Sequence, residues 1–183
     1  MSDVDVRDGA TIHGHVEIRI WDVDTVENAD PEWPNRPREE RHAMLQDPST
    51  YPAAPIHEGE TTNLAVDGYF EALAAGDNPQ PTHLAIGDDD TPAEATNTSL
   101  NNEVYRTVVG DDEPDGRDRV TSTFISQNEA NGYTLREIGF VTGAVDDNWQ
   151  LLTHVALDST DHIDKTSNNM IVYNYTLEWR RVS

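Results

Sequence analysis

Hydrophobic and polar residues alternate along much of the chain, which is the pattern of half-buried β-strands. In the first such stretch, residues 12–20, every second residue is apolar or glycine and the residues between are polar or charged. Further stretches follow at 83–86, 103–109, 120–126, 133–141, 149–157 and 169–182. From residue 83 onward, turn-forming residues and no helical pattern separate these stretches, so the sequence predicts a mainly β fold, an antiparallel β-sandwich or barrel.

One stretch has helical spacing instead. Its apolar residues are Leu64, Val66, Tyr69, Phe70 and Leu73. Thr62 or Asn63 can cap the start of such a helix, and Gly76 suits the position after its end. We therefore predict one α-helix over about residues 63–75.

Six of the ten prolines lie between residues 28 and 61. This composition predicts an irregular arm with a short helix near Arg38–Gln46. Long loops of this kind are often bound to a partner, so Trp33 and Tyr51 are candidates for anchoring the arm on a neighbouring chain. The alternative is a strap packed on its own chain. The chain then divides into an N-terminal strand (1–27), the arm (28–61) and a β domain (62–183).

The formal net charge of −23 excludes nucleic acid and anionic membranes as main partners, because both are negatively charged. The acidic residues are spread through the chain, and Lys165 is the single lysine. At about 1 M salt the screening length falls to roughly 3 Å, so repulsion within such a protein is weak. We therefore expect a folded, halophilic protein.

Several chemistries have no support in the sequence. There is no cysteine, no apolar run long enough to span a membrane, no signal-peptide pattern, no Gly-x-Ser-x-Gly turn and no glycine-rich phosphate loop. A glycosidase needs one pair of carboxylates, and nothing singles out a pair among 35 acidic residues. We therefore expect a protein that is not an enzyme and has no cofactor.

A metal site has one candidate pair of ligands, His13 and His15. They lie on one face of the first predicted strand, with Glu17 next along that face. An oligomer axis could collect several copies around one ion, but two histidines do not close a site. The expectation is therefore no metal, with both histidines in solvent or at an interface. The run Asp88-Asp89-Asp90 lacks the spacing of a calcium loop and is interpreted as hydrated.

Two charged pairs lie inside predicted strands, Glu103 with Arg106 and Arg136 with Glu137. Buried charges are costly unless paired, so we expect cross-strand ion pairs, Arg106 with Glu137 or Glu103 with Arg136. Gly139, in the second strand, indicates that a large group or another backbone lies against it.

The last predicted strand is long and aromatic. Ile171, Tyr173, Tyr175, Leu177 and Trp179 share one of its faces. A strand of this length often extends toward a neighbour. We therefore expect Tyr173, Tyr175 and Trp179, together with Trp33 and Tyr51, to contribute to assembly.

Four segments occur in an order that resembles the phage tail-collar fibre proteins and related fibre or baseplate attachment domains of tailed viruses. They are Asn63-Leu-Ala-Val-Asp-Gly68, His83-Leu-Ala-Ile-Gly87, Leu100-Asn-Asn-Glu-Val-Tyr-Arg106 and Arg136-Glu-Ile-Gly-Phe140. The resemblance covers about residues 62–160. It implies a structural β domain in a homo-oligomeric appendage, often a trimer. The acidic composition adds the expectation of a haloarchaeal host.

The expected function is therefore that of a virion structural protein, in a tail fibre, baseplate or collar. It would lie on the virion exterior after assembly in a high-salt host cytoplasm, with copies of itself and other virion proteins as partners. One alternative is a capsid-surface turret or decoration protein. Another is a receptor-binding module in which Trp33, Trp149 or Trp179 stacks on host-surface glycans.

Overall fold

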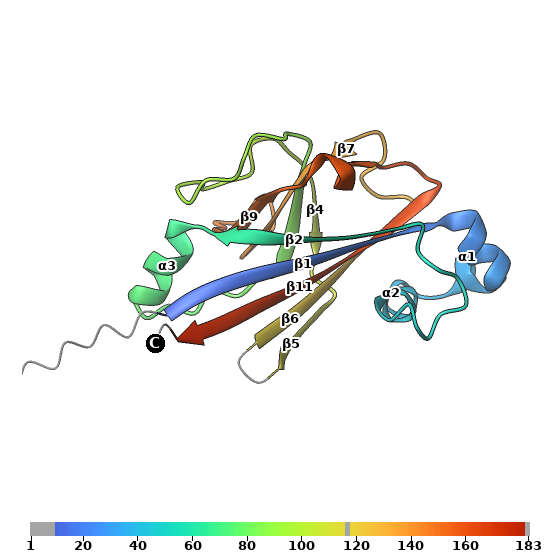
Figure 1. Cartoon of the computed structure of the whole chain (residues 1–183), viewed down its shortest axis with the longest axis horizontal. Helices are drawn as coiled ribbons and strands as arrows, with labels where there is room; N and C mark the ends of the chain where they lie inside the picture. The colour runs from blue at the N-terminus through green and yellow to red at the C-terminus, as the bar shows by residue number, and fades with distance from the viewer. Residues whose placement is uncertain (1–9, 116–117, 182–183) are drawn as a thin grey trace, which may run out of the picture.

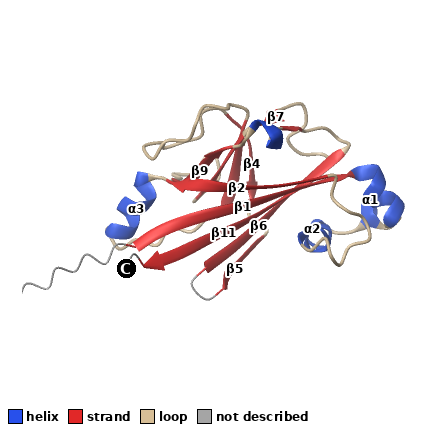
Figure 2. Ribbon diagram, viewed as in Figure 1, coloured by secondary structure: helices blue, strands red, loops and turns tan. Residues whose placement is uncertain are grey.

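A single antiparallel sheet dominates the computed structural model, which describes residues 10–115 and 118–181 and the side chains of 14–110 and 119–178. Within these residues nine strands pair in the order β4-β3-β8-β9-β2-β1-β11-β6-β5, and the sheet is nearly closed into a barrel (Figures 1 and 2). The strands are β1 (Ala10–Asp22), β2 (His57–Ala65), β3 (His83–Gly87), β4 (Glu103–Val108), β5 (Asp111–Asp115), β6 (Asp118–Ile125), β8 (Glu137–Val141), β9 (Leu151–Ala156) and β11 (Asn169–Arg181). Short strands β7 (Thr134–Leu135) and β10 (Ile163–Asp164) form a separate pair. The predicted mainly β class is confirmed.

β2 was not predicted as a strand. Residues 57–65 pair with β1 from Asn63 back to His57, and Leu64 and Ala65 pair with β9. The expected helix therefore starts later, as α3 (Asp67–Ala74). Leu64, assigned to the helical stripe, lies on the strand and is 39% exposed. Gly76 has a positive φ of 88° just after Ala75, the C-cap of α3, as the sequence predicted.

The proline-rich segment folds back on its own chain. α1 (Val23–Ala29) leads from β1 into it, and a 3-10 turn (Trp33–Asn35) and α2 (Arg38–Gln46) follow; α2 occupies the range of the predicted short helix. The described residues thus hold three α-helices, of which α1 was not predicted. Asp22 starts α1 by accepting a hydrogen bond from the backbone N–H of Thr25 at 2.8 Å. In Figure 1 this segment covers one end of β1, β11 and β6.

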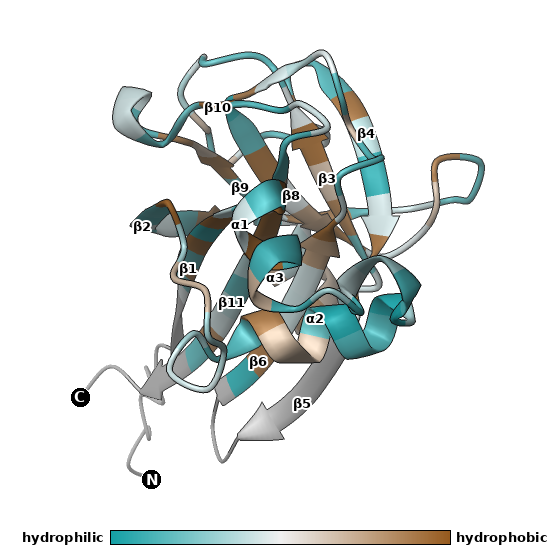
Figure 3. Cartoon of the chain, turned by 90° about the vertical axis from the view of Figure 1, so that its right-hand side faces the viewer, coloured by the Kyte–Doolittle hydropathy of each residue, from teal (hydrophilic) through white to brown (hydrophobic). Residues whose placement is uncertain are grey.

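Two hydrophobic cores lie on opposite faces of the long strands. The larger one fills the barrel. In it, Val16 and Ile18 of β1 lie directly opposite Tyr175 and Tyr173 of the neighbouring strand β11. The smaller one lies under the proline-rich segment and consists of Trp21, Val23, Val26, Trp33, Leu45, Tyr51, Ala53, Phe124, Met170 and Val172. Figure 3 shows hydrophobic residues along the strands and hydrophilic residues in the surrounding loops. Among the described residues, none of the helices has the length and apolar character needed to cross a bilayer.

Candidate functional site

Glu137 is the centre of a buried polar network. Its side chain is fully buried on β8, and its carboxylate accepts hydrogen bonds from the backbone N–H groups of Asn101 at 3.0 Å and Asn102 at 2.7 Å. A third donor is Nε2 of His154 on β9, at 2.8 Å. Three N–H donors offset the cost of burying one carboxylate. Glu137 therefore fastens the 88–102 loop to the barrel.

His154 extends this network to a second point of the same loop. Its fully buried ring places Nδ1 2.8 Å from Oδ1 of Asn97, and that oxygen also accepts the backbone N–H of Glu94 at 2.7 Å. Both ring nitrogens thus lie at hydrogen-bond distance from an oxygen, so the ring links Glu137 on β8 to Asn97 of the loop.

The predicted cross-strand ion pairs are wrong, and the strand order gives the reason. β3 lies between β4 and β8, so Glu103 and Arg106 are not beside Arg136 and Glu137. Arg106 binds Glu103 on its own strand instead, with Nη2 2.6 Å from Oε2, and its guanidinium stacks on Trp149 at 4.1 Å. Nη1 of Arg136 lies 3.4 Å from the backbone oxygen of Asp88.

Gly139 lies where β8 and β9 pack closely. A Cβ at this position would lie 2.6 Å from the backbone oxygen of Thr153 and 2.9 Å from side-chain atoms of Leu100 and Leu151. A backbone oxygen cannot move away without breaking the sheet, so a side chain does not fit here. Leu100 directly precedes the two asparagines that Glu137 binds, so the same loop packs on both sites.

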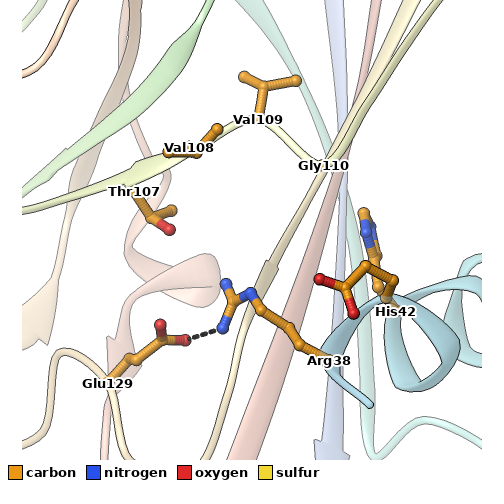
Figure 4. Close-up of a pocket in the computed structure, with 8 residues that line it drawn as sticks. Arg38, His42, Thr107, Val108, Val109, Gly110 and Glu129 are labelled. Carbon is orange, nitrogen blue, oxygen red and sulfur yellow. Dashed lines mark hydrogen bonds and ion pairs between the residues drawn. The ribbon is translucent and has the colours of Figure 1, made fainter.

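A cavity of about 440 Å³ lies between α2 and the edge strand β4, where the barrel does not close (Figure 4). Arg38 and Glu129 line one side of it as an ion pair, with Nη1 2.7 Å from Oε2 (Figure 4). Burial opposes ionisation of Glu129, but hydrogen bonds from Arg38 and Ser126 outweigh it and lower the pKa of this carboxyl. Burial and the nearby Glu129 raise the pKa of Tyr105 to about 12.

His42 and Ser122 meet beside this cavity but do not form a nucleophile and base. Nε2 of His42 lies 2.8 Å from Oγ of Ser122, and that hydroxyl donates to Oδ1 of Asn174 at 2.7 Å. A serine nucleophile has to give its proton to the base. Here the hydroxyl hydrogen points to an amide, and the pair joins α2 to the sheet.

Four aromatic residues expected to assemble copies of the chain are buried within it. Trp33 and Tyr173 are fully buried, and Tyr175 and Tyr51 are exposed by 1% and 7%. β11 is also paired on both sides, with β1 and β6, so its edges are not free for a neighbour. The assembly role of these four side chains is corrected to packing of the chain's own cores. The side chain of Trp179 lies outside the described residues, as does that of His13.

The single lysine of the chain, Lys165, is 1% exposed. Its Nζ donates to Oδ1 of Asn131 at 2.9 Å and to the backbone oxygen of Thr166 at 2.8 Å. Burial lowers the pKa of this amine from an ordinary 10.5 to about 8, against the attraction of Glu129.

We expect the free energy of unfolding to rise with pH between about 8 and 10.5, because there the unfolded chain holds more protons on Lys165 than the folded chain does. Because the chain has one lysine, ¹³C-labelled lysine gives a single side-chain signal in an NMR spectrum. We expect the chemical shift of that signal to titrate near pH 8. The variant Lys165→Met should lose this part of the rise in stability. A signal titrating at the ordinary 10.5 would contradict the burial of the charge.

Sequence reasoning found Glu137 but missed its partners. His154 lies in the apolar strand 151–156, where a histidine and a threonine among buried neighbours signal a paired polar group. The asparagines act through their backbone N–H groups, which every residue except proline has, so their identity does not reveal this role.

The sequence matches no family model, and neither the curated proteins nor the solved structures contain a match.

Proposed function

We propose that this protein is a non-enzymatic structural component of a virus particle, a homo-oligomeric attachment domain of a tail fibre, baseplate or collar. One observation carries the proposal: the segments that resemble tail-collar fibre proteins come together in space. β4, β3 and β8, which contain three of them, are neighbours in the sheet. The fourth segment begins α3, where Asp67 donates its backbone N–H to Ala95 of the 88–102 loop at 2.7 Å.

The chemistry of this convergence supports a structural role. Glu137 and His154 are fully buried, and the groups around them are the chain's own backbone and side chains. A general acid or base has to reach its substrate within hydrogen-bond distance. A carboxylate enclosed by two backbone N–H groups and an imidazole instead fixes one loop on the barrel, which suits a domain that has to present a constant surface.

Oligomeric state in concentrated salt tests the proposal. We expect light scattering during size exclusion in molar KCl to give a homo-oligomer, most simply a trimer. A monomer at micromolar concentration would contradict the assembly role.

After dialysis to low salt we expect a less stable protein, because the net charge of −23 is then poorly screened. Unchanged stability and oligomeric state would contradict a halophilic origin.

Location on the particle separates the two exterior assignments. Antibodies against the protein should bind purified particles at the tail if the attachment assignment holds. Binding over the capsid shell would favour the turret or decoration alternative instead. Absence of the protein from purified particles would contradict both.

Glycan binding is the second candidate function, and one groove favours it. Trp149 is partly buried at the edge of a groove of about 610 Å³ lined by side chains that include Asn78, Gln80 and Asn148. Amide side chains and an indole face are common means of binding sugar hydroxyls and rings. Trp33 is excluded from this role because it is fully buried.

A further inference from the structure

Three possible metal ligands meet on the outward face of β1 and β2. His15 and Glu17 lie on β1, and Glu60 lies directly opposite Glu17 on β2. One ring nitrogen of His15 and one carboxylate oxygen from each glutamate all lie within 4.8 Å of one another. Strand alternation predicted that His15 and Glu17 share one face of a strand. Glu60 could not be added to them from the sequence, because β2 was not predicted as a strand.

The arrangement is unfavourable without a cation. Like charges directly opposite on paired strands repel each other, and the chain carries a net charge of −23. Arg19 offsets part of this repulsion, with Nη2 2.8 Å from Oε2 of Glu17. Within the part of the chain that the structure describes, the side chains of His15 and Glu60 make no hydrogen bond or ion pair. Two ligand groups are therefore available on a backbone that the sheet holds in place.

We propose that His15, Glu17 and Glu60 bind a divalent transition-metal ion, with Zn²⁺ as the best fit. Zinc accepts imidazole nitrogen and carboxylate oxygen at about 2.0–2.2 Å, and three protein ligands are typical of a site with one open position. Tetrahedral ligands at these distances lie roughly 3.4 Å apart, so three atoms within 4.8 Å of one another have to close by at most about 1.4 Å. Glu60 is exposed, and rotation of its side chain can supply that movement.

The ligand set discriminates between metals. Calcium and magnesium prefer sites made entirely of oxygen, whereas imidazole suits zinc, copper and nickel. A bound ion would join β1 to β2 across the centre of the sheet. The open position faces outward, so water or a group from another molecule would complete the coordination. This site is independent of the proposed virion function.

Calorimetric titration of the tag-free protein with ZnCl₂ in molar KCl tests the site. We expect saturable binding of one equivalent, and at least tenfold weaker binding by His15→Ala and by Glu60→Gln. The matched control is Glu58→Gln, which removes an acidic side chain from the same face of β2, opposite Arg19. This control should bind zinc as the unaltered protein does.

Thermal unfolding gives an independent readout. Saturating zinc should raise the unfolding temperature of the unaltered protein and of Glu58→Gln equally and that of Glu60→Gln by less, because ligand binding stabilises the folded state by mass action in proportion to its affinity. Equal binding by all the variants would show unspecific attraction to an acidic surface and overturn the site. Calcium binding as tight as zinc binding would overturn the assignment to a transition metal.

Discussion

Replacing Glu137 by alanine is expected to lower the free energy of unfolding by about 3–5 kcal/mol, because each buried group left without its hydrogen-bond partner costs about 1–3 kcal/mol. The loss has two sources. The backbone N–H groups of Asn101 and Asn102 lose their acceptor, and His154 is left buried opposite a void. Urea denaturation in molar KCl, followed by tryptophan fluorescence, measures the change.

Two companion variants identify the source of this loss. Glu137→Gln keeps the shape and one acceptor oxygen but removes the charge, so we expect an intermediate loss. Glu71→Ala removes an exposed acidic side chain from α3 and should change stability by no more than about 0.5 kcal/mol. A loss below about 1 kcal/mol in Glu137→Ala would mean that the loop is not held by this carboxylate.

Replacing Trp33 by alanine is expected to cost about 3–5 kcal/mol, the range for truncating a large buried aromatic side chain. Trp33 is fully buried, and its ring lies 5.8 Å from that of Tyr51, centroid to centroid. Because both rings pack within one chain, the loss should not depend on protein concentration. Denaturation at two concentrations a hundredfold apart checks this.

The control for Trp33→Ala is Phe70→Ala, which truncates an aromatic residue that is 40% exposed on α3. We expect a smaller loss there, because less apolar surface leaves the core. A loss in Trp33→Ala that grows on dilution would show that the proline-rich segment packs on a neighbouring chain. That result would restore the assembly role that the burial of Trp33 argues against.

Alternation predicted most strands because one side of each faces the barrel core. It failed for β2, whose residues 57–63 include Gly59 and polar side chains but no apolar alternation. This strand is held by backbone pairing with β1 rather than by its own side chains. The helical stripe beginning at Leu64 then appeared because the end of this strand and α3 adjoin in sequence.

The polar network was only half predictable. An acidic residue between Arg136 and Ile138 in a strand signals a buried charge that needs a partner, and that signal is correct. The partner depends on strand order, which places β3 between β4 and β8 and brings β9 to the other side of β8. Aromatic residues pose the same difficulty, because Trp33 and Tyr51 are suited equally to a partner's surface and to the chain's own second core.

The pairing of β1 with β11 has a consequence for biosynthesis. Thirteen residues of one strand pair with thirteen of the other, and the two are separated by most of the chain. β11 has to emerge from the ribosome before β1 gains this neighbour, so the barrel stays incomplete while the residues between the two strands are being made. Until then Val16 and Ile18 lack the tyrosines that cover them, and slow folding of this kind exposes a newly made chain to aggregation. Intracellular salt and molecular chaperones would therefore matter most during this interval.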